Sequence, residues 1–300
     1  MKAIIAGNAP SLKAIDYTRM PSWGDVFRCN QFYFEDKYYL GKKIKAVFYN
    51  PSVFLEQFYT LRYLIDNGEY SGIERIVLSN YGLKQLEDDF MMNFSSYFPS
   101  ATIGYDVLKN LVEFDAFIKY NELYLGRRIT SGIYMCAFAV ALGYEEIYLC
   151  GIDFYQNGGG AYAFDSQTTN LLKLGFDGKK AAVHTKEFDL KALEMLDKTY
   201  KVKFYSLCPD SILSKFIDLA PITRPKSQFI LESKPKDYTK DILLPSIEAY
   251  HAQNNSQKIF SKNLILQFIK NIFDLPRDIR AYLKYRRDRK MRMDRKKHRK

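Results

Sequence analysis

Short apolar segments alternate with longer amphipathic segments between residues 2 and 205, and this alternation constrains the fold more than any other feature of the chain. Apolar runs of about four to eight residues between turn signals are typical of buried strands, whereas apolar residues at helical spacing indicate helices. Alternating strands and helices favour an α/β fold, a parallel sheet with helices on both faces. The expected strands are Lys2–Ala6, Asp25–Cys29, Ile44–Tyr49, Arg75–Ser79, Glu146–Cys150 and Lys201–Tyr205, and the expected helices are Ser52–Asn67, Leu83–Phe94, Val107–Leu125, Ser131–Leu142 and Glu187–Thr199.

The first strand leads into the turn Gly7-Asn8-Ala9-Pro10-Ser11, which resembles the start of a nucleotide-binding βαβ unit. Only one glycine is present where a dinucleotide-binding fingerprint has three. An NAD-dependent oxidoreductase, one alternative for such a fold, also needs an acidic residue at the end of the second strand. This chain has Asn30-Gln31 there, which argues against that alternative.

Polar residues follow several of the expected strands. Asn8, Asn30 and Asn50 each come after a different strand, and Asp153 and Phe154 follow the strand that ends at Cys150. In a parallel sheet the carboxyl ends of the strands meet at one edge, where ligands bind. A single asparagine is more often a turn residue, but three at one edge suit a polyhydroxylated, phosphate-bearing ligand, because amides both donate and accept hydrogen bonds.

The positive charge is concentrated at the C-terminus. The chain has a net charge of +11, and residues 277–300 hold 13 lysines and arginines and 3 aspartates, a net of +10. The rest of the chain is nearly neutral and has no nucleic-acid-binding motif. Taken alone, the tail suggests either nucleic-acid binding, which is the second alternative function, or an amphipathic anchor on anionic lipid. The anchor is favoured by the apolar residues Ile279, Tyr282, Leu283 and Tyr285.

Four widely spaced cysteines show no metal-ligand spacing, and reduced thiols in a cytosolic protein are expected. The N-terminus runs straight into a strand, so no signal peptide is expected, and no apolar stretch is long enough to span a bilayer. Residues 156–183 are rich in Gly, Asn and Lys without periodicity, which is typical of a functional lid. An amphipathic segment resumes near Lys262, and Pro276 is expected to interrupt it.

Five segments carry a family resemblance: IIAGNAPSL, FRCNQFYFEDKYYLGKK, VFYNPS, RITSGIYMCAFAVALGYEEIYLCGIDFYQNG and YAFD. They resemble the bacterial sialyltransferases of glycosyltransferase family 42, typified by the Campylobacter lipooligosaccharide enzymes, over roughly residues 1 to 215. The resemblance implies a Rossmann-like sheet with a small lid near the C-terminal ends of the strands. It further implies transfer of N-acetylneuraminic acid from CMP-N-acetylneuraminate with inversion, without metal or cofactor.

The resemblance implies that galactose (α-2,3) or sialic acid (α-2,8) of lipooligosaccharide accepts the sugar, and the sequence leaves this choice open. It also implies a homotetramer, cytoplasmic and peripherally associated with the inner membrane through the basic C-terminus. The expected organisation is a nucleotide-sugar-binding domain (1–153 and 185–260), a lid (154–184) and a basic amphipathic tail (261–300). Ala9 stands where the family usually has glycine, which is tolerable if its φ is negative.

The chemistry requires a base, donors for the leaving phosphate, and groups that orient the sugar. Of three histidines, His184 lies just before a helix, whose N-terminus disfavours protonation. The residues alone favour a surface histidine there, but the resemblance implies a general base. It likewise implies Tyr155 and Tyr162 as phosphate donors and Arg128 as an orienting residue. Further substrate-binding residues are expected to be Gly7, Asn8, Asn30, Gln31, Asn50, Gln57, Thr130, Ser131, Gly132, Asp153 and Phe154, with Thr130 or Ser131 also suited to cap a helix.

Overall fold

A computed structural model describes residues 1–80, 88–155, 162–165, 183–223, 225, 231–235 and 264–297, without the side chains of residues 52, 88–92 and 288–297. The chain divides into two compact units, Met1–Leu244 and Pro245–Lys300. Most of the expected lid, residues 156–161 and 166–182, lies outside the described residues. The lid and the proposed domain boundaries therefore stay predictions.

The first unit is built on one eight-stranded sheet in which every neighbouring pair is parallel, as the alternating pattern predicted. The strand order is β5-β4-β3-β2-β1-β6-β7-β8, so the order reverses between β1 and β6. Two short strands at the sheet edges, β5 and β8, were not expected. The strands are β1 (Lys2–Ala6), β2 (Asp25–Cys29), β3 (Ala46–Tyr49), β4 (Arg75–Leu78), β5 (Ala101–Ile103), β6 (Glu146–Cys150), β7 (Lys203–Ser206) and β8 (Asp218–Leu219).

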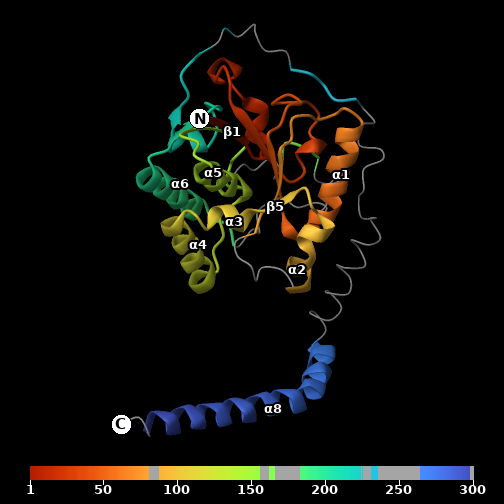
Figure 1. Cartoon of the computed structure of the whole chain (residues 1–300), viewed down its shortest axis with the longest axis vertical. Coiled ribbons are helices and arrows are strands. Elements are labelled where there is room, and N and C mark those ends of the chain that lie inside the picture. Colours follow the sequence, from red (N-terminus) through yellow and green to blue (C-terminus); the bar gives the residue numbers. More distant parts are fainter. Residues whose placement is uncertain are drawn as a thin grey trace. The chain divides into compact units, whose positions relative to one another are not determined.

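Helices cover both faces of this sheet (Figure 1), which confirms the predicted fold class. Alternate residues of β1 pack on opposite faces of the sheet. Ala3 and Ile5 belong to the hydrophobic core that packs against α5 and α6, whereas Ile4 and Ala6 belong to a separate hydrophobic cluster. A third cluster packs α1 against β3 and β4. The helices of this unit are α1 (Phe54–Asp66), α2 (Asp88–Tyr97), α3 (Gly104–Leu108), α4 (Val112–Leu125), α5 (Ser131–Ala141) and α6 (Lys186–Tyr200).

Three helix predictions need correction. The connection from β1 to β2 contains 3₁₀ turns at Pro10–Ala14 and Tyr17–Arg19 in place of an α-helix. The single helix expected over Val107–Leu125 is divided into α3 and α4, because a turn through residues 109–111 buries Leu111 in the core. The helix expected over Leu83–Phe94 corresponds to α2, which ends later than expected, at Tyr97; its expected start lies among residues 81–87, outside the described residues.

The second unit contains one long helix, α8 (Leu264–Lys297). Pro276 lies inside this helix, so the expected interruption there is wrong. A proline removes one backbone donor and kinks a helix, but it need not end it. None of the described helices is both long and apolar enough to cross a membrane.

Candidate active site

The candidate site lies where the strand order reverses, at the carboxyl ends of β1 and β6. The loops after these strands touch: Gly7 N donates to Cys150 O at 3.0 Å, and Ala9 N donates to Gly151 O at 3.0 Å. A Cβ on Gly7 would lie 2.2 Å from Gly151 O, so only glycine fits there. Ala9 has a φ of −74°, which satisfies the condition for alanine at that position.

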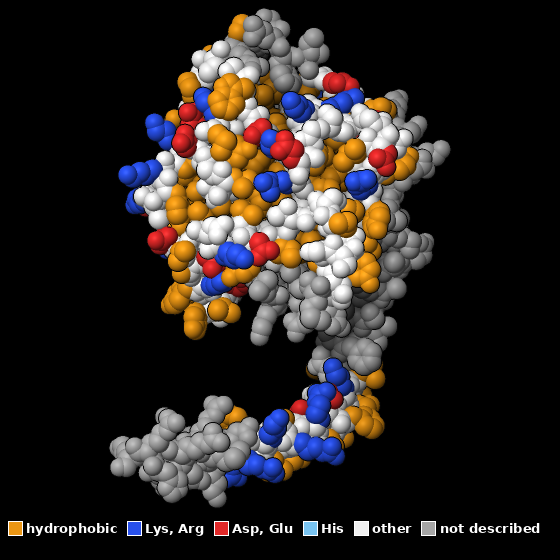
Figure 2. Space-filling view, in the orientation of Figure 1, with side chains coloured by type: hydrophobic (Ala, Val, Ile, Leu, Met, Phe, Trp, Pro, Cys, Tyr) orange, Lys and Arg blue, Asp and Glu red, His pale blue; other side chains and the backbone are white. Residues whose placement is uncertain are grey.

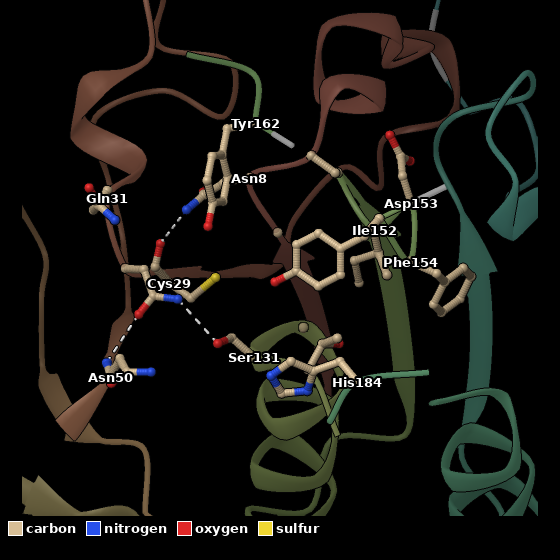
Figure 3. Close-up of a pocket in the computed structure, with 17 residues that line it drawn as sticks. Asn8, Cys29, Gln31, Asn50, Ser131, Ile152, Asp153, Phe154, Tyr162 and His184 are labelled. Carbon is tan, nitrogen blue, oxygen red and sulfur yellow. Dashed lines mark hydrogen bonds between the residues drawn. The ribbon is translucent and has the colours of Figure 1, made fainter. Parts of the chain in front are cut away.

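A cavity of about 350 Å³ opens beside these loops. Thirteen of the fifteen predicted site residues line it, and Arg128 and Gln57 do not. Figure 3 shows its side chains converging from the ends of several strands and from α5. The lining residues are Gly7, Asn8, Ala9, Cys29, Asn30, Gln31, Asn50, Thr130, Ser131, Gly132, Gly151, Ile152, Asp153, Phe154, Tyr155, Tyr162 and His184.

Hydrogen bonds orient the side chains of Asn8 and Asn30 (Figure 3). Asn8 Nδ2 donates to Cys29 O at 2.9 Å. Asn30 Nδ2 donates to Ser131 Oγ at 3.1 Å, and Asn30 Oδ1 accepts from Asn50 N at 3.0 Å. Asn30 therefore connects the ends of β2 and β3 with the start of α5.

A buried ion pair beneath Asn8 was not anticipated from the sequence. Arg28 and Glu35 are both almost fully buried and pair through their side chains. The Arg28 guanidinium also lies 3.5 Å from Asn8 Oδ1. Because Arg28 alternates with apolar residues on β2, nothing in the local pattern distinguishes it from an exposed strand residue.

His184 contributes a partly buried imidazole ring to the cavity lining. Its Nδ1 lies 2.9 Å from Arg128 O. Burial lowers its pKa below the ordinary value, although the carbonyl of Arg128 acts in the opposite direction. Burial, and not the nearby helix N-terminus on which the sequence argument relied, is thus the main cause. Since a carbonyl oxygen only accepts, the neutral ring donates from Nδ1, and Nε2 carries the lone pair.

Arg128 itself contributes to the site through its backbone. Its N donates to Val183 O at 2.8 Å, and its guanidinium forms an ion pair with Glu122 Oε1 at 2.7 Å. Gln57 lies further away, fully buried on α1, where its Nε2 donates to Val53 O at 3.2 Å. The structure therefore places Gln57 in the packing around α1 and away from the cavity lining.

Two tyrosines flank the cavity. Burial raises the pKa of Tyr155 to about 12, and burial also raises the pKa of Tyr162, so both hydroxyls remain protonated at neutral pH. The Tyr155 ring centroid lies 6.3 Å from that of His184, and the Tyr162 ring stacks on Phe164 with centroids 4.9 Å apart. Ala163 N donates to Asn8 O at 2.6 Å, which fixes the chain next to Tyr162 against the first loop.

The N-terminus of α5 faces the same cavity, with Ser131 and Gly132 in its lining. A Cβ on Gly132 would lie 2.8 Å from Ile152 Cδ1, so glycine allows the helix to approach the β6 loop closely. Thr130 occupies the N-cap position but, within the described residues, makes no capping hydrogen bond. Its hydroxyl donates to the buried carboxylate of Asp189 at 2.8 Å, so capping by Thr130 is wrong.

Asp153 and Asn8 lie on opposite sides of Ile152 in the view of Figure 3. Asp153 Oδ2 accepts from Ser11 N at 3.0 Å and thereby connects the β6 loop with the turn after β1. Among the residues that the structure describes, no group of three or more His, Cys, Asp or Glu side chains could hold a metal ion.

Comparison with known proteins decides the family. The sequence model described as "Alpha-2,3-sialyltransferase (CST-I)" matches residues 1–286. The chain belongs to this family. The family resemblance seen in the sequence is thus confirmed, and the protein is a glycosyltransferase of the sialyltransferase type.

Solved structures agree with this assignment. The sialyltransferase CstII from Campylobacter jejuni, in complex with cytidine-5'-monophosphate, is 57% identical with a TM-score of 0.73, over 88% of this chain and 98% of that one. A CST-II structure with a trisaccharide acceptor and CMP is also 57% identical, with a TM-score of 0.72, over 88% of this chain and 100% of that one.

Two further relatives cover most of the chain. The monofunctional alpha-2,3-sialyltransferase Cst-I from Campylobacter jejuni is 49% identical with a TM-score of 0.75, over 86% of this chain and 95% of that one. An uncharacterized protein of Haemophilus influenzae is 42% identical over 75% of this chain and 98% of its own length. These results favour the glycosyltransferase hypothesis over the oxidoreductase and nucleic-acid alternatives.

Proposed function

We propose that the protein transfers N-acetylneuraminic acid from CMP-N-acetylneuraminate to a galactose or sialic acid hydroxyl, with inversion and with His184 as the general base. The observation that supports this most directly is the partly buried His184 ring, whose Nδ1 lies 2.9 Å from the Arg128 carbonyl. That hydrogen bond leaves the basic Nε2 to accept the proton of the acceptor hydroxyl as it attacks the anomeric carbon. The C–O bond to CMP breaks in the same displacement.

Tyr155 and Tyr162 are proposed to donate hydrogen bonds to the departing phosphate. Their raised pKa values keep both hydroxyls protonated, as donors must be. The phosphate of a CMP-sugar carries one negative charge before cleavage, so neutral donors can suffice where a pyrophosphate leaving group would call for a cation. We therefore propose a reaction without metal or cofactor.

The remaining cavity groups are assigned to binding. The backbone amides at the start of α5 suit an anion, the sialic acid carboxylate or the phosphate. Asn8, Asn30 and Asn50 are proposed to hold phosphate, ribose and sugar, with Gln31 beside them. We expect Asp153 and Phe154 to lie near the cytidine, and Arg128 to orient either the acceptor or the carboxylate.

The decisive experiment is incubation with CMP-N-acetylneuraminate plus lactose or sialyllactose, with mass spectrometry of the products and NMR of the new linkage. A product from lactose alone indicates α-2,3 transfer, and a product from sialyllactose indicates α-2,8 transfer. An α-linked product from the β-linked donor establishes inversion. Absence of transfer to both acceptors, with hydrolysis of the donor at most, would contradict the proposal.

The C-terminal unit is proposed to bind an anionic inner-membrane surface, which would hold a cytoplasmic enzyme beside a lipooligosaccharide acceptor. Along α8, exposed apolar side chains lie among basic ones (Figure 2). Each basic residue near an anionic surface contributes about 1 kcal/mol, and residues 277–300 have a net charge of +10. The exposed apolar residues of α8 include Ile265, Phe268, Ile269, Ile272, Leu275, Ile279, Tyr282 and Leu283.

Binding to phosphatidylglycerol vesicles tests this part of the proposal. The full chain should bind and should dissociate as salt is raised, and a chain ending before α8 should not bind yet should transfer sialic acid to lactose at the full rate. Replacing Phe268 and Ile272 with glutamine removes apolar area without changing the charge, and should weaken binding at high salt most. Equal vesicle binding by the full and shortened chains would exclude the tail as the anchor.

We also propose a homotetramer, on the family resemblance alone. One of the solved relatives is a monomeric CstII, so a monomer is the state that the test must distinguish from a tetramer. Light scattering of the purified full chain tests the proposal, and a monomeric mass across the working concentration range would contradict it.

A further inference from the structure

Two threonines at equivalent positions of neighbouring helices behave in opposite ways. Thr185 precedes α6, and its side chain caps that helix by accepting from Phe188 N. Thr130 precedes α5 with a similar extended backbone (φ −72°, ψ 164°), but its hydroxyl makes no cap. The residue type and the backbone conformation suit a cap in both cases, so the difference must come from the surroundings.

The surroundings differ by one carboxylate. Asp189 is fully buried, and its two oxygens accept from Thr130 N at 2.9 Å and from Thr130 Oγ1 at 2.8 Å. Asp189 lies on α6, where its own N donates to Thr185 O at 3.1 Å, so its position is fixed by that helix. The hydroxyl hydrogen and the backbone N–H of Thr130 are both directed at Asp189.

The consequence falls on the first amides of α5. The first hydrogen bond within the helix is Tyr134 N to Thr130 O at 2.9 Å, which leaves the amides of Ser131, Gly132 and Ile133 ahead of the helical ladder. A capping threonine would accept from the second or third of these amides. Gly132 lines the cavity, so a cap would occupy donors that face the ligand.

We infer that Asp189 is a positioning residue: it holds the Thr130 hydroxyl away from the α5 amides, so that these amides bind the anionic group of the donor. This inference rests on the proposed function. The anion is the carboxylate of the sialic acid or the phosphate of CMP, and both are recognised by the same backbone donors. Asp189 does not touch the substrate, but it decides whether the amides that do are occupied.

The inference makes an unusual prediction about a double variant. In Asp189→Ala the released hydroxyl turns to cap α5 and competes with the ligand, so donor affinity should fall on the order of tenfold, as expected from the contribution of an N-cap. Adding Thr130→Val removes the competing hydroxyl, and donor affinity should partly recover. A purely structural role of Asp189 predicts that the second substitution causes further loss.

Calorimetry measures affinity for CMP and for CMP-N-acetylneuraminate, with His184→Asn in every chain to prevent turnover. Loss and recovery with both ligands identify the phosphate as the anion at α5, and loss and recovery with the CMP-sugar alone identify the carboxylate.

Asp189→Asn is the matched control, because its amide can donate to Thr130 Oγ1 and retain that hydroxyl, and its affinity should stay within about threefold of the reference. An Asp189→Ala chain that binds as the reference does, or a double variant that binds still more weakly than Asp189→Ala, would overturn the inference.

Amide hydrogen exchange gives a second test that needs no variant at Asp189. Binding of CMP-N-acetylneuraminate to the otherwise unaltered chain should slow the exchange of the Gly132 and Ile133 amides, and unchanged exchange in a saturated complex would overturn the inference. Failure of the proposed function looks different: the unaltered chain would then neither bind the CMP-sugar nor form product. Normal transfer without the Asp189 and Thr130 effects would refute the inference alone.

Discussion

Replacing His184 with asparagine tests the general base while retaining its structural hydrogen bond. The ring Nδ1 lies 2.9 Å from Arg128 O, and the amide nitrogen of an asparagine side chain can donate to the same carbonyl. Asparagine has no basic lone pair in the working pH range. The substitution therefore removes the base and leaves the contact between residues 128 and 184 in place.

The size of the effect follows from the state of the ring. Because burial lowers the pKa of His184 below its ordinary value of about 6.5, at pH 7.5 neutral rings outnumber protonated ones by roughly ten to one or more. Nearly all of the enzyme thus carries the base, and its full contribution is lost in the variant. A general base contributes about 10²–10⁴ in rate, so kcat should fall at least about a hundredfold, or ~2.7 kcal/mol in activation free energy.

Initial rates with CMP-N-acetylneuraminate and lactose or sialyllactose measure this effect, and KM for the donor should change by less than about threefold. The pH profile supplies an independent check. Since burial lowers the pKa of His184, the acidic decline of wild-type kcat/KM should have its midpoint below the ordinary histidine pKa of about 6.5. That acidic decline should vanish in the variant. A folded His184→Asn protein with kcat within tenfold of wild type, or with the same acidic decline, would refute the assignment.

Further substitutions test the leaving-group, loop and carboxylate arguments. Tyr155→Phe and Tyr162→Phe should each lower kcat by more than about tenfold with little change in donor KM, and a higher KM at unchanged kcat would instead indicate ground-state binding. Gly7→Ala brings a Cβ within 2.2 Å of a backbone carbonyl oxygen, so urea denaturation should show a loss of several kcal/mol in the free energy of unfolding. In the control Gly41→Ala the Cβ meets nothing within 4 Å, and the loss should be about 1–2 kcal/mol because of the positive φ. Burial raises the pKa of Asp189 to about 7, so the folded state holds a proton that the unfolded state releases near pH 4. The free energy of unfolding of the wild type should therefore decline as pH rises from about 4 to 7. Asp189→Asn should flatten that decline.

The strand-end residues could be predicted from the sequence because geometry alone brings them together. Asn8, Asn30 and Asn50 follow strands that lie side by side, and the carboxyl ends of parallel strands share one edge. No knowledge of side-chain packing was needed to place them on one cavity. The family resemblance supplied His184 and the two tyrosines, which residue type and spacing could not have selected among three histidines and 24 tyrosines.

The supporting residues could not be predicted, because their role depends on partners far along the chain. Asp189 follows a helix start and reads as an ordinary acidic residue of the first turn, yet it accepts two hydrogen bonds from Thr130, 59 residues earlier. Arg28 occupies a strand position that commonly faces solvent, yet it is buried against Glu35 and Asn8. Local patterns report which face a residue occupies, and they carry no information about the partner that satisfies a buried polar group.

The single glycine of the opening turn has a structural explanation that differs from the one the dinucleotide fingerprint suggests. In that fingerprint, the glycines let a helix N-terminus directly after the first strand approach a pyrophosphate. Here β1 is followed by a 3₁₀ turn, and Gly7 serves the contact between the β1 and β6 loops. The helix whose N-terminus faces the cavity is α5, 124 residues after that glycine. On the proposed function, the close backbone approach and the anion-binding helix come from different segments, which accounts for the absence of the extra glycines. On the inference drawn above, Asp189 is the residue that keeps the α5 amides available.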